Sequence, residues 1–237
     1  MHQRFLLAIP CLLLCLGVGC GTGEYQKRLA QNLGKSQKAS KFNQLYGLQK
    51  LAGTSVSIRM PLLFTKSPLV EGAMVDGKPV DARRVKPGLV ELPGLKLTYE
   101  GAIRDAEGGE LPYYCYVGTT QVNGDQAKNI RGEIHGDLSQ NPQYESLTNW
   151  VDFQGETPEG RKVLWEKLRF VNDQDFYYKD KNGQERFVPM PGMLEVYLHE
   201  EAGILTILAW RMPVSIEQNV GVAELAAMVA GSVSVQP

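Results

Sequence analysis

The stretch that decides the fold is MLEVYLHEEAGILTILAWRM, residues 193–212. Met193–Leu198 and Ile204–Met212 are apolar runs rich in strand-forming residues, and the polar segment His199–Gly203 separates them. Two such runs joined by a short polar segment predict an antiparallel pair of strands with a turn at His199–Gly203. The second run is almost continuously apolar, which is typical of a strand covered on both faces.

Similar strand signals continue in both directions from this pair. Asn182-Gly183 between two short extended pieces is a strong hairpin signal. The period of the apolar residues predicts helices at 125–138 and 220–230. Further strands are expected at 55–60, 96–100, 112–119, 150–154, 162–171, 176–178, 186–188 and 232–235. This order predicts one α+β domain over residues 54–237, a mostly antiparallel β-sheet with helices packed on it.

Three short segments of this domain resemble the PsbP family of photosystem extrinsic subunits and its relatives. They are SVSIRMP at Ser55–Pro61, TILAWRMP at Thr206–Pro213 and, after a helix, SVSV at Ser232–Val235. The resemblance covers Thr54–Gln236 and implies a binding scaffold, although a shared fold does not identify a ligand.

The N-terminus has the pattern of an export signal. Met1–Arg4 is a short basic start, and Phe5–Val18 is an uncharged run with the length of a signal-peptide core, too short to span a bilayer. The small residues of Gly17-Val18-Gly19 lead directly into Cys20. This pattern resembles the lipobox signal peptides of bacterial lipoproteins, and the chain resembles the uncharacterised members of that class.

The lipoprotein resemblance implies a processing scheme. Residues 1–19 would be removed and Cys20 would carry diacylglycerol and often a further acyl chain such as palmitate, since two or more chains hold a protein stably on a membrane. The protein would then be exported and face the periplasm or the outside. Two alternatives stay open: ordinary signal-peptide cleavage near residues 21–23, and an uncleaved short anchor.

Residues 20–53 are interpreted as a lipidated N-terminus and a basic helical stalk. Helical periodicity predicts two pieces, separated by Gly34 and the polar residues up to Ser40, which would cap the second. Glu24–Lys50 has six basic residues and one acidic residue (6 − 1 = +5), whereas Leu51–Pro237 has 18 basic and 25 acidic residues (18 − 25 = −7). The stalk is either a solvated spacer or a contact with anionic lipid headgroups. The headgroup contacts would be Lys27, Arg28, Lys35, Lys38 and Lys41.

Composition narrows the function classes. Of 237 residues, 43% are hydrophobic and 22% charged, and the net charge is −1, which argues against a disordered chain. A pI near 6.3 argues against a nucleic-acid partner.

Candidate catalytic or metal-binding residues each have a simpler interpretation. Cys115, with His135 or His199, would form a thiol–imidazole pair, but its strand position favours a buried, inert cysteine. His199-Glu200-Glu201 has metal-ligand chemistry, yet successive turn residues point in different directions. The possible calcium ligands lack the spacing of an EF-hand. They are Asp173, Asp175, Asp180 and Asn182.

Aromatic residues are the remaining candidates for a ligand groove, although on strands they are more often core residues. They are Tyr113, Tyr114, Tyr116, Trp165, Tyr177, Tyr178 and Trp210. We therefore expect no catalytic residue, cofactor or metal, and a non-enzymatic module that binds an unknown envelope protein or ligand. The alternatives are an exported enzyme whose active site follows no common motif and a purely structural envelope spacer.

Overall fold

The structure is a computed structural model that describes residues 22–67, 74–75, 78–79, 92–139 and 149–236. The chain divides into two units, residues 1–43 and residues 44–237. No described helix is long and apolar enough to cross a membrane. Cys20 and the predicted signal peptide lie outside the described residues.

In the described part of the first unit, residues 22–43, the chain forms the continuous helix α2 at Thr22–Lys41. The predicted break at Gly34 is wrong, because a single glycine costs only about 1 kcal/mol and both neighbouring turns keep their helical hydrogen bonds. Ser40 does not begin a second helix; its hydroxyl donates to the carbonyl oxygen of Gln37 at 2.8 Å. After α2 the chain forms the 3₁₀ turn η1 at Phe42–Gln44 and the short strand β1 at Gln49–Lys50.

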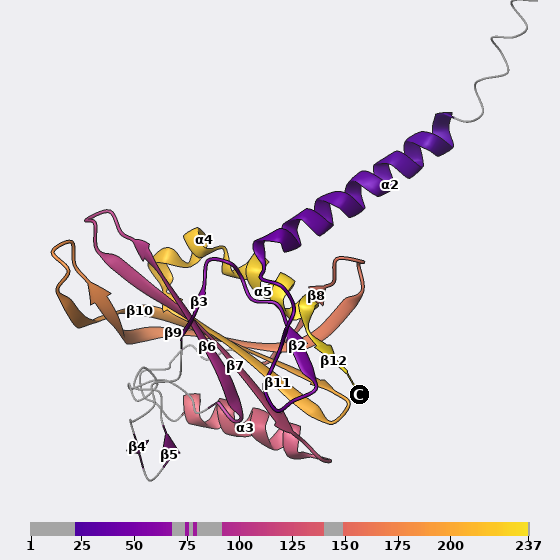
Figure 1. The fold of residues 1–237 in the computed structure, drawn as a ribbon. Helices are drawn as coiled ribbons and strands as arrows, with labels where there is room; N and C mark the ends of the chain where they lie inside the picture. The colour runs from indigo at the N-terminus through magenta and orange to yellow at the C-terminus, as the bar shows by residue number, and fades with distance from the viewer. Residues whose placement is uncertain (1–21, 68–73, 76–77, 80–91, 140–148, 237) are drawn as a thin grey trace, which may run out of the picture. The chain divides into compact units, whose positions relative to one another are not determined.

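The second unit is an α+β domain built on a seven-stranded antiparallel sheet, as the sequence predicts (Figure 1). Its strand order is β3-β6-β7-β11-β10-β9-β8. The bounds are Thr65–Ser67 (β3), Leu95–Arg104 (β6), Glu110–Gln121 (β7), Val151–Glu156 (β8), Lys162–Lys179 (β9), Glu185–Glu201 (β10) and Ile204–Pro213 (β11).

Smaller elements complete the second unit. A three-stranded sheet has the order β1-β2-β12, with β2 at Val56–Ile58 and β12 at Ser234–Val235; β4 (Met74–Val75) and β5 (Lys78–Pro79) form a two-stranded ribbon. The helices are α3 (Gln126–Ser139), η2 (Val214–Ile216), α4 (Glu217–Val220) and α5 (Val222–Ser232). The two helices predicted at 125–138 and 220–230 are thus confirmed as α3 and α5.

The predicted pair at 193–212 is confirmed, but its turn is shorter than expected. β10 runs through His199 to Glu201, so only Ala202 and Gly203 form the turn, at φ values of 52° and 73°. Positive φ at both turn residues matches the twist of the flanking strands. β11 is buried along nearly its whole length, as expected of a strand covered on both faces.

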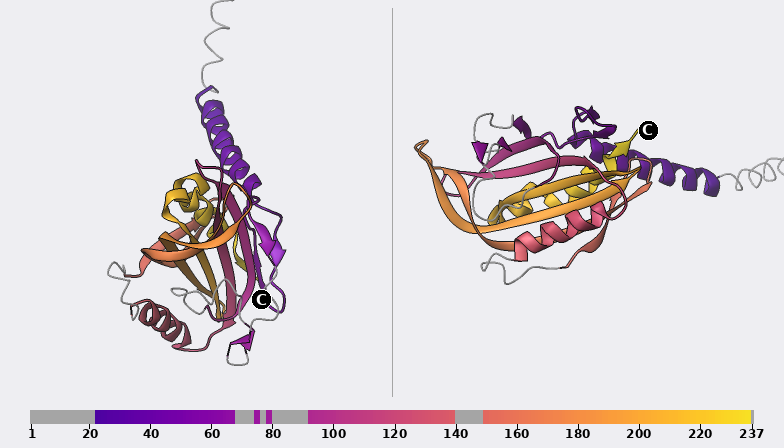
Figure 2. Two further views of the ribbon diagram at one scale, coloured as in Figure 1. Left: turned by 90° about the vertical axis from the view of Figure 1, so that its left-hand side faces the viewer. Right: turned by 90° about the horizontal axis from the view of Figure 1, so that it is seen from below.

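Different helices cover the two faces of the large sheet (Figures 1 and 2). On one face, α3 packs through Ala127, Ile134 and Leu138 into a core with side chains of the strands, among them Tyr114 and Tyr116. On the other face, the indole nitrogen of Trp165 donates to the Ala230 carbonyl oxygen of α5 at 3.2 Å. Because strand side chains alternate, each central strand contributes to both cores.

The hairpin arm of β9 and β10 curls until the end of β9 reaches β7, where Glu110 pairs with Lys179. Gly192 in β10 permits this curvature. A Cβ atom there would lie 2.6 Å from the Phe176 ring and 2.9 Å from the Gln174 side chain, so the missing side chain leaves space for both.

Candidate functional site

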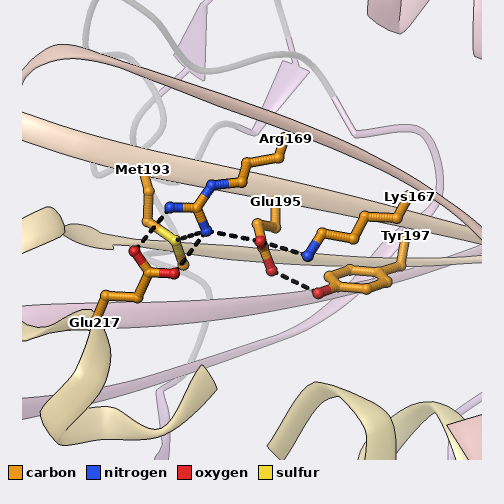
Figure 3. Close-up of polar contacts among 6 residues, drawn as sticks. All are labelled: Lys167, Arg169, Met193, Glu195, Tyr197 and Glu217. Atoms are coloured by element: carbon orange, nitrogen blue, oxygen red, sulfur yellow. Dashed lines mark hydrogen bonds and ion pairs between the residues drawn. The ribbon is translucent and has the colours of Figure 1, made fainter. Parts of the chain in front are cut away.

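The largest set of connected charges described is an ion cluster between β9, β10 and α4 (Figure 3). Glu195 is 1% exposed, and its Oε1 atom accepts from Lys167 Nζ at 2.6 Å and from Arg169 Nη1 at 2.8 Å. Its Oε2 atom accepts from the Tyr197 hydroxyl at 2.5 Å. Arg169 also donates from both terminal nitrogens to the two carboxylate oxygens of Glu217 at 2.6 and 2.7 Å.

Strand alternation assembles this cluster. Lys167 and Arg169 lie two residues apart on β9, and Glu195 and Tyr197 lie two apart on β10, so all four share one face. Glu195 is paired with Arg169 in the strand register, and Tyr197 with Lys167. Glu217 opens α4, and its carboxylate points toward the Arg169 guanidinium (Figure 3).

The cluster keeps Glu195 ionised. Burial alone would raise the pKa of Glu195, but the hydrogen bonds from Lys167, Tyr197 and Arg169 outweigh it, so the pKa is below its ordinary value. Burial, together with the Glu195 charge, raises the pKa of Tyr197. The hydrogen bond to Glu217 is the main cause of the raised pKa of Arg169. Both oxygens of Glu195 therefore accept hydrogen bonds, and neither is positioned as a general base; the cluster ties α4 to the sheet.

A buried cation, Arg211 of β11, lies inside the curled end of the sheet. Its side chain is among the buried polar groups, at 3% exposure, and its Nε atom donates to Gln174 Oε1 at 2.8 Å. Its Nη2 atom donates to the Asp175 carbonyl oxygen at 2.7 Å, and the guanidinium lies 4.4 Å from the Phe176 ring centroid. Burial lowers the pKa of Arg211. Arg211 thus links β11 to β9 across Gly192 of β10.

A cleft of about 450 Å³ lies where the start of β7 meets the end of β9; we call it the end cleft. Its ionisable lining consists of three carboxylates, one ammonium group and two phenols. The lining residues are Thr65, Glu100, Gly101, Ala102, Glu110, Pro112, Tyr114, Tyr177, Lys179 and Glu185. Lys179 Nζ lies 3.7 Å from Glu110 Oε2, and the Tyr177 hydroxyl donates to Glu185 Oε2 at 2.5 Å.

The structure separates Cys115 from His135, one of the two candidate imidazole partners of its thiol. Cys115 is a fully buried free cysteine, and burial raises the pKa of its thiol well above the ordinary value. Its strand neighbours Tyr114 and Tyr116 join the core under α3, the helix that bears His135, so Cys115 points to the opposite face. An inert buried cysteine is the interpretation that this geometry supports.

His199 and Glu201 are closer than predicted, because both belong to β10 and share a face. His199 Nε2 lies 3.5 Å from Glu201 Oε2, and His199 Nδ1 lies 2.7 Å from the Leu164 carbonyl oxygen. Glu200, between them on the strand, faces the other way. Nowhere in the described parts of the chain do three His, Cys, Asp or Glu side chains gather as a metal site requires.

The possible calcium ligands are distributed along the β9–β10 arm. Asp173 and Asp175 belong to β9, whereas Asp180 stabilises the hairpin turn: its Oδ1 atom accepts from the backbone N–H groups of Asn182 at 2.8 Å and Gln184 at 2.9 Å. The carboxylate of Asp180 thus has a structural role in the turn.

Most of the candidate aromatic residues are core residues, as expected. Tyr113, Tyr114, Tyr116, Trp165 and Trp210 are buried, and Tyr114 lines the end cleft together with the exposed Tyr177. The sequence reasoning missed the ion cluster. The one local sequence signal of this cluster is Glu195 inside the apolar run 193–198, because a carboxylate that is buried in such a strand requires a hydrogen-bond or charge partner.

Comparisons with known proteins identify no family. Neither a scan against models of protein families nor a search of curated proteins finds a match. Similar solved structures include the cyanobacterial PsbP protein CyanoP of Synechocystis, with 12% identity, a TM-score of 0.39 and coverage of 80% of this chain and 92% of that one. The Ran-binding protein Mog1p of Saccharomyces cerevisiae has 14% identity, a TM-score of 0.39 and coverage of 80% and 94%. Sequence identities and TM-scores this low support no conclusion about the function of this chain.

Proposed function

We propose that this protein is an exported lipoprotein, anchored to a bacterial membrane through acylated Cys20, whose α+β domain binds an envelope component without catalysing a reaction. The observation that carries the proposal is the N-terminal sequence, in which a basic start and a 14-residue uncharged run lead into Gly-Val-Gly-Cys. In the α+β domain, both oxygens of the buried Glu195 already accept hydrogen bonds and the Cys115 thiol is buried, which supports the non-enzymatic part of the proposal.

The basic residues of α2 add a second proposed membrane contact. Tyr25, Leu29 and Leu33 form an exposed apolar stripe, each four residues from the next. At 100° per residue, Lys27 projects about 160° and Lys35 about 120° away from Leu29 around the helix axis. A membrane therefore contacts either the stripe or the basic face. We favour the basic face, because each Lys or Arg close to anionic headgroups contributes about 1 kcal/mol.

The experiment is to replace Cys20 by Ser and to measure metabolic labelling with palmitate and membrane fractionation. The matched control is Cys15→Ser, which changes a neighbouring cysteine inside the predicted signal peptide. We expect Cys20→Ser to abolish the label and to leave only weak membrane association that disappears at high salt, since salt screens the basic contacts. Intact mass of the wild-type protein extracted from membranes reports cleavage and acylation together. Equal labelling of both variants, or no label in the wild type, contradicts the anchor.

A further inference from the structure

Three leucines near the start of the second unit are exposed: Leu48, Leu62 and Leu63, which we call the leucine surface. Their side chains are 50%, 50% and 47% exposed, although leucine is among the residues that proteins bury most often. Leu48 directly precedes β1, and the other two follow β2, its antiparallel partner. Backbone pairing extends past these strands, since the N–H group of Leu62 donates to the Gln44 carbonyl oxygen at 2.8 Å. The three leucines therefore lie on two neighbouring segments.

The same part of the chain carries positive charge without negative charge. From Tyr25 to Leu63 the sequence contains seven Lys or Arg residues and no Asp or Glu. Two of these cations, Lys50 and Arg59, belong to the second unit. The charge of Arg59 acts on Glu159 in the turn between β8 and β9. Lys50 of β1 is exposed, and in the described parts of the chain no carboxylate lies within ion-pair distance of it. A cation that can pair with an external anion thus adjoins the leucine surface.

We propose that the leucine surface docks on the anionic headgroups of the membrane that holds the acyl anchor. Interfacial binding strengthens with buried apolar area and with attraction to anionic lipids, and this surface offers both. A second copy of the chain on the same surface would bring like charges together, whereas headgroups neutralise them.

Chain length supports the same occupant. α2 ends at Lys41, so three peptide units, at most about 11 Å, connect it to Gln44, where the second unit begins. A membrane contact of α2 therefore brings the start of this unit close to the same bilayer. The inference rests on the proposed lipid anchor, and it adds that the α+β domain itself contacts the membrane.

The test uses the processed protein, extracted from membranes and reconstituted into vesicles. Leu63→Cys carries a fluorophore whose emission shifts to the blue in apolar surroundings; Cys115 is fully buried and does not react under native conditions. The matched control is Leu164→Cys on β9, since Leu164 is 65% exposed and faces away from α5. We expect a blue shift at position 63 on vesicles of phosphatidylcholine with phosphatidylglycerol, a smaller one on phosphatidylcholine alone, and none at position 164.

Lys50→Gln, combined with the label at position 63, tests the charge. Removing one cation near anionic headgroups should lower the ratio of docked to undocked protein about 5-fold. Lys181→Gln, the same change in the exposed turn of the β9–β10 arm, should leave this ratio unchanged. Far-UV circular dichroism checks folding.

Three results overturn the inference: equal shifts at positions 63 and 164, equal shifts on the two kinds of vesicle, or equal loss in Lys50→Gln and Lys181→Gln. The parent chain, which has no introduced cysteine, tests the anchor separately. Label on that chain reports a free thiol in the N-terminal segment and contradicts acylation, whereas the fluorophore at position 63 still reports docking on added vesicles.

Discussion

Replacing Glu195 by Gln is the sharpest test of how the charges hold this domain together. Gln keeps the shape of Glu, and its amide can preserve the contacts: the carbonyl oxygen accepts from Lys167 and Arg169, and the NH₂ group donates to the Tyr197 oxygen. The substitution therefore removes the charge while leaving three hydrogen bonds in place.

The cost follows from the strength of those bonds. Hydrogen bonds to a charged group contribute about 1.5–3 kcal/mol each and neutral ones about 0.5–1.5, a difference of about 1 kcal/mol per bond. Lys167 and Arg169 are 20% and 33% exposed, so water recovers part of the loss. We expect Glu195→Gln to lower the free energy of unfolding by about 2–3 kcal/mol. Glu217→Gln, the matched control at the more exposed end of the cluster, should cost about 1 kcal/mol or less.

The loss should also depend on pH. Because folding lowers the pKa of Glu195, its charge contributes stability that is complete above the unfolded-state pKa and disappears as pH falls through the folded-state pKa. A protonated Glu195 resembles Gln, so the difference between the wild type and Glu195→Gln should begin to shrink as the pH falls below the unfolded-state pKa of Glu and should vanish only below the lowered folded-state pKa.

Urea unfolding measures both effects, with the fluorescence of the buried Trp165 and Trp210 as the signal and pH lowered stepwise from 7. The reasoning fails if Glu195→Gln costs no more than Glu217→Gln at pH 7. It also fails if the gap between wild type and Glu195→Gln stays constant as the pH is lowered.

Two backbone predictions use the same urea assay. Gly231→Ala should destabilise the domain by about 1–3 kcal/mol, because the added Cβ would lie 2.5 Å from the carbonyl carbon of Glu156 in β8. The control Gly132→Ala, whose Cβ would lie in open space on α3, should stabilise it by up to about 1 kcal/mol. An unchanged stability of Gly231→Ala would contradict the close packing of α5 on β8. Ala202→Gly should raise the free energy of unfolding by about 0.5–1 kcal/mol, because it removes the strain of an alanine in the left-handed region, which exceeds the extra conformational entropy that glycine gives the unfolded chain. A lower urea midpoint would refute this prediction.

Local sequence patterns predict α3, α5 and six of the seven strands of the large sheet, but they miss β1 and β3 and the lengths of the two longest strands, β9 and β10. The sequence predicts β9 as two pieces, because Asn172 and Gln174 interrupt the apolar alternation. Both side chains are nevertheless buried, and Gln174 accepts from Arg211, which lies on β11 and far away in sequence. Polar residues with distant partners look like loop residues until the partner is known, so a local pattern cannot assign them to a strand.

The end cleft was beyond local prediction for the same reason. Glu100 and Glu185 meet there only because the arm curls and β9 pairs with β7. The position of Gly192, which leaves space for Phe176, permits that curvature, yet a lone glycine in a strand is an ambiguous signal. The continuity of α2 has a different cause: a single glycine such as Gly34 costs only about 1 kcal/mol in a helix interior, which does not end a 20-residue helix.

The ion cluster also constrains the register of the sheet. Side chains alternate between faces, so a one-residue slip of β9 against β10 would turn Lys167 and Arg169 toward the apolar core that contains Leu168, Phe170 and α3. Each unpaired cation there would cost several kcal/mol, whereas an apolar replacement of the whole cluster would cost little in the correct register. We infer that the cluster penalises the wrong pairing of β9 more than it stabilises the correct one. Charges in an otherwise apolar pair of strands thereby specify which face receives α4.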